Sequence, residues 1–244
     1  MNPFYMIELQ LDLPALLRFL ASQGLNRSDD DDDLGYGVHA WMAAAFGELA
    51  PQPWRLFVGK SRPARVLGYA AHDAAELRQR LLEFADPSVV AVCAEPDTAI
   101  ASREMPAVWR TGRRLAFEVQ CCPVARKART GVEKDLFLVR ADHRGAPGLR
   151  RDAVYCEWGR EQLERHDAAR VDAIRLEGFR LVRQTRKDRE SGERRVCRRI
   201  VRPQALLRGE LTVRDPEAFA ALLRRGVGRH RAFGYGMLLL SPAP

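Results

Sequence analysis

The chain has 244 residues, of which 40 are Lys or Arg and 32 are Asp or Glu, so its formal net charge is +8. This length fits one large domain or two small ones, and a hydrophobic fraction of 46% excludes a wholly disordered chain. The longest apolar run, residues 40–46, is far shorter than the roughly 18 residues of a membrane span. No basic segment typical of a signal peptide opens the chain. We therefore expect a soluble, cytoplasmic protein with no membrane partner.

The basic side chains are almost all arginines and are unevenly distributed. Arginine binds phosphate bidentately, which suits contact with nucleic acid, although a GC-rich genome enriches arginine in the same way. Residues 1–60 contain four basic and eight acidic side chains, whereas residues 179–202 contain ten basic and three acidic ones. This distribution predicts a positively charged patch in the C-terminal half.

The first half of the chain alternates between strand and helix patterns. Asp73 is a candidate N-cap, because its side chain can accept hydrogen bonds from the first free N–H groups of a helix. Residues 88–94 fit either a strand or an irregular segment. In chain order, we expect a strand over 5–11, helices over 14–22 and 34–46, strands over 54–59 and 65–70, a helix over 74–85 and a strand over 114–122.

The second half repeats this rhythm. We expect a helix over 155–165, strand-like segments over 173–184 and 194–201 around a polar turn, a strand over 206–213, a helix over 216–225 and a strand over 237–241. Asp215 and Pro216 are typical of the N-cap and first position of a helix. Two βαββαβ halves predict an α+β protein with two tandem ferredoxin-like (RRM-like) domains. We place the N-terminal domain at 1–135 and the C-terminal domain at 136–244.

A glycine cluster follows the last expected helix. It does not match a dinucleotide-binding fingerprint, because a helix precedes it, a strand follows it and the spacing differs. Glycines let a backbone approach a ligand closely, and basic side chains between them can hold phosphate; a helix C-cap joined to a turn is the plainer alternative. We favour phosphate binding for this loop, with glycines Gly226, Gly228, Gly234 and Gly236 and basic residues Arg229, His230 and Arg231.

A hairpin within residues 179–202 is the second candidate RNA-binding element. Arginines at this density along paired strands match the spacing of a phosphate backbone, and a two-stranded ribbon can lie in or across a groove. A solvated loop explains the same charge run about as well. The residues that we expect to contact RNA here are Arg180, Arg183, Arg186, Lys187, Arg194, Arg195, Arg198 and Arg199.

Tyr36 and His39 form the candidate catalytic pair. At positions i and i+3 of a helix, the phenol and the imidazole lie on one face. Cleavage of RNA by its own 2′-hydroxyl needs groups that move protons near neutral pH, and a histidine with a pKa of about 6.5 can do so. A histidine packed in the core is the alternative for a residue next to Trp41 and Met42.

The sequence contains no motif typical of a metal or nucleotide-triphosphate site. The run Asp29–Asp33 lacks the alternating acids of a calcium loop, and we expect it to be a solvated loop. We therefore expect no metal and no cofactor.

Residues 209–242, which include the glycine cluster, closely resemble the C-terminal end of the CasE (Cse-three) family, the CRISPR repeat endoribonucleases of type I-E Cascade. Residues 115–127 and 133–137 are also similar to segments of the family. Tyr36 and His39 fall where the family places a Tyr and a His on its first helix. The resemblance is dense over 205–242, moderate over 110–137 and thin over the N-terminal third.

The resemblance implies two ferredoxin-like domains and metal-independent cleavage of precursor CRISPR RNA at the 3′ base of a repeat stem-loop. It implies His39 as general acid/base, with Tyr36 positioning or activating the 2′-hydroxyl, and a crRNA that stays bound beside other Cascade-type subunits. It also adds RNA-binding residues after one strand, namely Arg126, Lys127 and Arg129.

One departure concerns the catalytic helix. Some relatives carry a Lys five residues after the His, where this chain has Ala44. We therefore expect the glycine loop to bring Arg229, His230 and Arg231 to the RNA backbone, with the scissile phosphate between these cations and His39. The alternative function is a non-catalytic subunit that only holds the RNA hairpin. A single-stranded RNA binder of the RRM type is disfavoured, because its aromatic pattern is missing.

Overall fold

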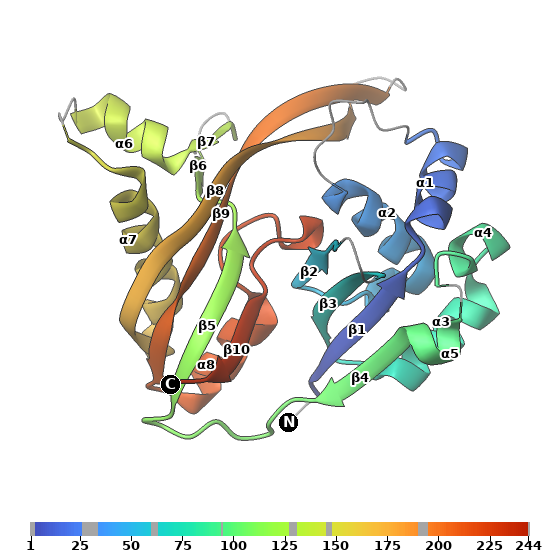
Figure 1. Cartoon of the computed structure of the whole chain (residues 1–244), viewed down its shortest axis with the longest axis horizontal. Coiled ribbons are helices and arrows are strands. Elements are labelled where there is room, and N and C mark those ends of the chain that lie inside the picture. The colour runs from blue at the N-terminus through green and yellow to red at the C-terminus, as the bar shows by residue number, and fades with distance from the viewer. Residues whose placement is uncertain are drawn as a thin grey trace. The chain divides into compact units, whose positions relative to one another are not determined.

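The computed structural model describes residues 3–25, 34–59, 63–93, 95–126, 131–144, 148–189 and 195–243, with side chains except at 143–144 and 184–199. Two four-stranded sheets organise these residues (Figure 1). Within these ranges, no helix is long and apolar enough to cross a membrane.

The first sheet uses the N-terminal part of the chain. Its elements are β1 (Tyr5–Leu11), α1 (Leu13–Ser22), α2 (Gly35–Phe46), the 3₁₀ turn η1 (Gly47–Leu49), β2 (Trp54–Phe57), β3 (Ala64–Ala70), α3 (Ala74–Phe84), α4 (Pro87–Val90), α5 (Pro96–Ala99) and β4 (Ile100–Glu104). The strand order is β2-β3-β1-β4, with Leu9 of β1 opposite Val66 and Ile100 in antiparallel ladders. This order is that of a ferredoxin-like βαββαβ unit, as expected.

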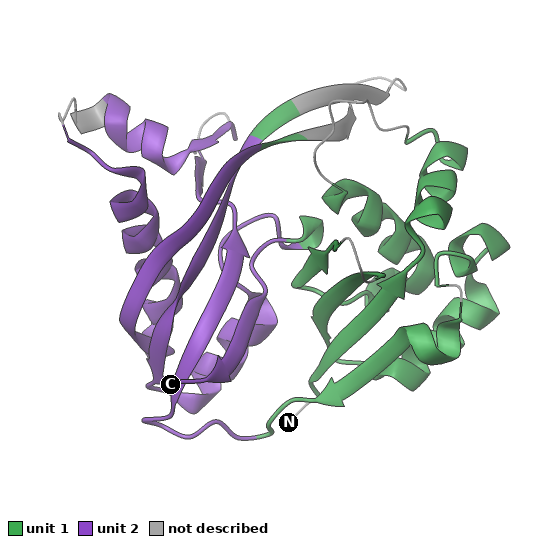
Figure 2. Cartoon of the chain, in the orientation of Figure 1, with its two compact units in different colours: residues 1–107, 182–201, 232–234 green, residues 108–181, 202–231, 235–244 purple. Residues whose placement is uncertain are grey.

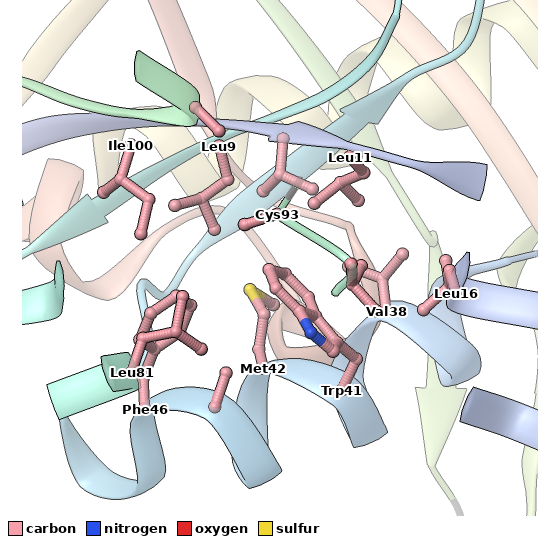
Figure 3. Close-up of a cluster of buried hydrophobic side chains, with 14 of the residues drawn as sticks. Leu9, Leu11, Leu16, Val38, Trp41, Met42, Phe46, Leu81, Cys93 and Ile100 are labelled. Carbon is pink, nitrogen blue, oxygen red and sulfur yellow. The ribbon is translucent and has the colours of Figure 1, made fainter. Parts of the chain in front are cut away.

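Helix α2 forms one wall of the core below this sheet. Its buried positions 38, 41, 42, 45 and 46 follow the helical period and face Leu9 and Leu11 of β1 (Figure 3). The Trp41 Nε1–H donates to the carbonyl of Val89 over 3.0 Å, so this buried indole is satisfied. Because the core occupies this side of α2, Tyr36 and His39 fall on another side and stay half-buried.

The second sheet uses the remainder of the chain. Its elements are β5 (Arg114–Cys121), α6 (Leu136–Arg144), α7 (Arg151–Glu164), the 3₁₀ turn η2 (Arg165–Asp167), β8 (Ala169–Arg189), β9 (Arg195–Val213), α8 (Pro216–Arg225), η3 (Arg231–Phe233) and β10 (Leu238–Pro242). The strand order β10-β5-β9-β8 is again the ferredoxin-like order. A separate two-stranded ladder joins β6 (Val124–Arg126) to β7 (Glu133–Asp135).

Side chains of α7 and α8 supply the helical part of the second core. Tyr155 and Leu163 of α7 and Phe219 of α8 are fully buried, together with alternate residues of β5. The expected caps are confirmed: the Asp215 carboxylate accepts from the N–H of Ala218, and Asp73 accepts from two N–H groups at the start of α3. These caps satisfy donors that have no partner inside their helices.

The chain divides into two compact units (Figure 2). Unit 1 comprises residues 1–107, 182–201 and 232–234, and unit 2 comprises residues 108–181, 202–231 and 235–244. The first change of unit falls between Ala107 and Val108, ahead of the boundary that we expected at 135/136. The three residues 232–234 are the last part of the chain in unit 1.

Three expectations about the elements were wrong. The strand at 114–122 does not close the first sheet but pairs with β9 and β10 in the second, and the short β4 closes the first sheet instead. Of the two alternatives for residues 88–94, the strand was wrong, because residues 88–93 form the end of the short helix α4 and then a turn. The segments that we expected as separate strands at 194–201 and 206–213 belong, from Arg195 on, to one continuous strand, β9.

Candidate functional site

Tyr36 and His39 meet at one phenyl ring. The ring centroid of Phe233 lies 5.0 Å from that of His39 in an edge contact and 6.1 Å from that of Tyr36 in a stacked contact. The expected shared face is therefore confirmed, because both side chains reach the same partner from successive turns of α2. The alternative of a core histidine does not hold, since His39 is half-buried.

The protonation of His39 follows from this environment. Burial lowers the pKa of His39 below its ordinary value of 6.5, because the charged imidazolium loses hydration. The imidazole is consequently neutral near pH 7 and can accept a proton. A partly exposed neutral imidazole beside a phenol is suited to acid–base chemistry.

Trp54 fixes the segment that carries Phe233. Its Nε1–H donates to the carbonyl of Ala232 over 3.1 Å, and its ring lies under Gly234. A Cβ at residue 234 would lie 3.0 Å from the indole, and the backbone there has φ +88°, so glycine is required on both counts. The buried indole thus holds the residues on either side of Phe233.

The glycine cluster has a largely structural explanation. All four expected glycines have positive φ, and Gly226, Gly234 and Gly236 are buried. A Cβ at Gly236 would lie 2.5 Å from the carbonyl oxygen of Val227, and one at Gly228 would meet the Trp158 ring at 2.9 Å. These close contacts and positive φ values explain why glycine occupies these positions without a ligand.

Glu133 of β7 gathers the basic residues of this loop. Its carboxylate accepts from Arg229 over 2.7 Å and from His230 and Arg202 over 2.8 Å each. The exposed fractions of the side chains are 9% for Glu133, 8% for Arg202, 13% for His230 and 47% for Arg229. His230 is therefore turned into a buried polar cluster, and Arg229 is the most exposed of the three basic side chains.

The pKa values in this cluster reflect both burial and charge. Burial alone raises the pKa of Glu133, but His230, Arg202 and Arg229 outweigh it and hold the pKa below its ordinary value. Burial lowers the pKa of His230, and the attraction of Glu133 opposes this only in part. The Glu133 carboxylate is therefore ionised throughout the neutral range.

The other expected RNA-binding residues differ in how far the structure describes them. Arg126, Arg180 and Arg183 are exposed, and Arg231 is half-buried and donates to the carbonyl of Arg225. Lys127, Arg129, Arg194 and the run Asp29–Asp33 lie outside the described residues. The backbone is described, but not the side chain, at Arg186, Lys187, Arg195, Arg198 and Arg199.

A second polar network, which the sequence did not suggest, lies at the start of α7. The guanidinium of Arg151 lies 4.3 Å from the ring centroids of both Phe137 and Phe179, and it also contacts Asp135. The Tyr155 hydroxyl donates to the same buried carboxylate over 2.8 Å. This arrangement ties α6, α7 and β8 together through one arginine.

Among the described residues, no three His, Cys, Asp or Glu side chains form a group that could hold a metal ion. Phe233 and Glu133 were not expected as partners of the candidate residues. Phe233 was visible as one of two aromatic residues inside the glycine cluster, and Glu133 as the first of two acids in the segment 133–137.

Comparison with known proteins gives concordant results. A family model described as "CRISPR associated protein" matches residues 4–242. A CRISPR-associated endoribonuclease Cse3 of Thermus thermophilus is 30% identical over 205 residues, which cover 73% of this chain and 88% of that protein.

Solved structures share the fold. The CRISPR endoribonuclease Cse3 bound to a 19 nt RNA is 22% identical with a TM-score of 0.61, over 98% of this chain and 100% of that chain. A chain of a CRISPR RNA-guided surveillance complex is 14% identical with a TM-score of 0.55, over the same shares of the two chains. At these identities, the likeness shows the fold.

Proposed function

Since this chain belongs to the CRISPR-associated protein family, we propose that it is an endoribonuclease that cleaves precursor CRISPR RNA and retains the product in a Cascade-type complex. The observation that carries the proposal is the pair of Tyr36 and His39, which contact one phenyl ring on the side of α2 away from the core. The relative from T. thermophilus is named an endoribonuclease, and a chain of the same fold belongs to an RNA-guided surveillance complex.

The proposed chemistry uses the 2′-hydroxyl of the RNA as nucleophile and needs no metal ion. His39 takes the proton of the 2′-hydroxyl, and the 2′-oxygen attacks the adjacent phosphorus. The bond from phosphorus to the 5′-oxygen breaks, the leaving oxygen takes a proton from water, and His39 returns its proton to the solvent. The products are a 2′,3′-cyclic phosphate and a 5′-hydroxyl. The lowered pKa of His39 supports this role, because the imidazole must be neutral to accept the proton. Tyr36 positions the 2′-hydroxyl.

The proposed substrate is a repeat stem-loop, cut at the 3′ base of its stem. Binding depends on basic side chains, since each cation that neutralises a phosphate releases a counterion. Arg126, Arg180 and Arg183 are exposed, and Arg229 is half-exposed, so all four can reach a phosphate backbone. The net charge of +8 favours such a partner.

The 2′-hydroxyl mechanism has a direct test. We expect an RNA with a single 2′-deoxy sugar at the scissile nucleotide to bind but remain uncut, and cleavage of the unmodified RNA to proceed in EDTA. Cleavage of the deoxy substrate at the rate of RNA, or loss of activity in EDTA, would contradict the mechanism.

A His39→Ala variant separates the enzyme from a non-catalytic RNA-hairpin-binding subunit. Proton-transfer groups contribute about 10²–10⁴-fold to rate, so we expect a loss of this order in single-turnover cleavage with RNA affinity retained. His72→Ala is the matched control, because His72 lies in the same unit and pairs with the exposed Glu76 over 2.8 Å. Equal cleavage rates for wild type and His39→Ala would remove His39 from the site, whereas a wild type that binds the repeat RNA without cleaving it would favour the non-catalytic subunit.

A further inference from the structure

The aromatic contact at α2 carries an inference that rests on the proposed function. We propose that Phe233 is a positioning residue, whose ring sets the side-chain conformations of Tyr36 and His39 for catalysis. Phe233 itself reaches no reacting atom in this proposal. It acts through the two side chains that it touches.

The geometry of the contact restricts both side chains at once. Centroid separations of 5.0 and 6.1 Å fall within the range of favourable aromatic pairs, and the edge and stacked orientations are the preferred ones. An exposed histidine or tyrosine on a helix otherwise samples several rotamers. One ring that fits both side chains selects one combination of these rotamers.

Phe233 is itself held in place. The hydrogen bond from Trp54 to the carbonyl of Ala232 fixes the residue before it, and the packing of Gly234 on the same indole fixes the residue after it. Trp54 is buried at the start of β2, so it belongs to the rigid sheet. The ring of Phe233 is therefore held from the sheet side, through β2, and not by α2 alone.

The contact is not part of the hydrophobic core. Phe233, Tyr36 and His39 are all half-buried and are absent from the buried cluster that packs α2 on the sheet. The core already holds α2 against the sheet, so the contact with Phe233 orients the side chains of Tyr36 and His39 and is not needed to hold the helix in place. Covering one side of the imidazole also removes water from it, in keeping with the lowered pKa of His39.

The first test measures the free protein. In Phe233→Ala, we expect the pKa of His39, followed by NMR of the imidazole carbon-bound protons, to rise toward 6.5 as water reaches the ring. Tyr36 is the titratable neighbour on α2, and the segment 232–234 and Trp54 contribute none. Phe84→Ala is the control, because Phe84 is an exposed ring of the same unit at the end of α3. An unchanged His39 pKa in Phe233→Ala would overturn the proposal.

The second test uses a repeat stem-loop RNA that the wild-type protein cleaves. Small misplacement of catalytic groups costs up to about 100-fold in rate, so we expect Phe233→Ala to lose about 10- to 100-fold in single-turnover cleavage with RNA affinity within about threefold. Phe233→Leu retains bulk under both side chains and should recover part of this rate. An unchanged rate in Phe233→Ala, or a loss that appears only as weaker RNA binding, would overturn the positioning role.

The two tests separate the inference from the proposed function. If the wild-type protein cleaves no repeat RNA but the His39 pKa still responds to Phe233→Ala, the endoribonuclease proposal fails and positioning for catalysis fails with it. If the wild-type protein cleaves the RNA, and Phe233→Ala changes neither the pKa of His39 nor the cleavage rate, only the positioning role is refuted.

Discussion

Replacing Glu133 by Gln tests how far one buried carboxylate supports the second unit. The change keeps the size of the side chain but removes the charge that faces Arg202, Arg229 and His230. Arg202 and His230 are almost fully covered, so they lose a partner that water cannot replace. His230 also has a φ of +63°, a conformation that a non-glycine residue keeps only when its surroundings hold it.

The expected magnitude follows from these exposures. Removing one partner of a buried ion pair costs about 3–5 kcal/mol, whereas an ion pair as exposed as that of Arg229 contributes about 0–1 kcal/mol. Because the amide oxygen of Gln still accepts one hydrogen bond, we expect the lower end, a loss of about 3 kcal/mol in the free energy of unfolding at pH 7.

Urea-induced unfolding measures this loss. Glu210→Gln is the matched control, since Glu210 makes a single contact with the exposed Arg114, and a change below about 1 kcal/mol is expected there. The folded-state pKa of Glu133 is lower than its ordinary value of 4.5, so its stabilisation is complete above that pH and is lost as the pH falls through the folded-state pKa. The difference between wild type and Glu133→Gln should therefore persist at pH 5 and close in stronger acid. A loss no larger than that of Glu210→Gln would refute the reasoning.

Two further changes test local structure by thermal unfolding. Gly236→Ala places a Cβ 2.5 Å from the Val227 carbonyl oxygen at a φ of +82°. It should destabilise the protein clearly more than Gly112→Ala, where the φ is the same but the surrounding space is open and the expected cost is about 1–2 kcal/mol. Equal losses in the two variants would mean that the Val227 backbone moves aside freely. Asp215→Ala removes the N-cap of α8 and should lower the free energy of unfolding by about 1 kcal/mol. Asp215→Asn keeps a side-chain acceptor and should retain most of this stability. Equal losses of stability in the two variants would argue against the cap.

Local signals predicted the local structure well. The period of apolar residues and the capping aspartates gave α1, α2, α3, α7 and α8 within about four residues, because these preferences act over one or two turns, but α6 and the short α4 and α5 were not expected. Strand β4 escaped notice because only Ile100 of its five residues is buried, so it shows no alternation. The strand over 114–121 was recognised but assigned to the wrong sheet, since a strand pattern predicts a conformation and not the partner that pairs with it.

In the candidate site, too, local features could be predicted from the sequence and long-range contacts could not. The i, i+3 spacing of Tyr36 and His39 predicts one face of a helix, and this is a local property. What that face meets is not local, because Phe233 lies close to the other end of the chain. The basic residues of the glycine loop were visible in the sequence. Their pairing with Glu133 was not, because Glu133 is about 96 residues away in the chain and reaches Arg229 and His230 only in the folded second unit.

Because residues 232–234 belong to unit 1, the two units cannot be separated by a single truncation of the chain. A fragment that ends at residue 107 contains the first sheet and its helices but leaves the Trp54 indole without the carbonyl of Ala232, and leaves Tyr36 and His39 without the ring of Phe233. A truncation after residue 231 removes Phe233 from unit 1 and the edge strand β10 from unit 2. Neither piece carries a complete copy of its own unit, so loss of activity on shortening the C-terminus reports on both.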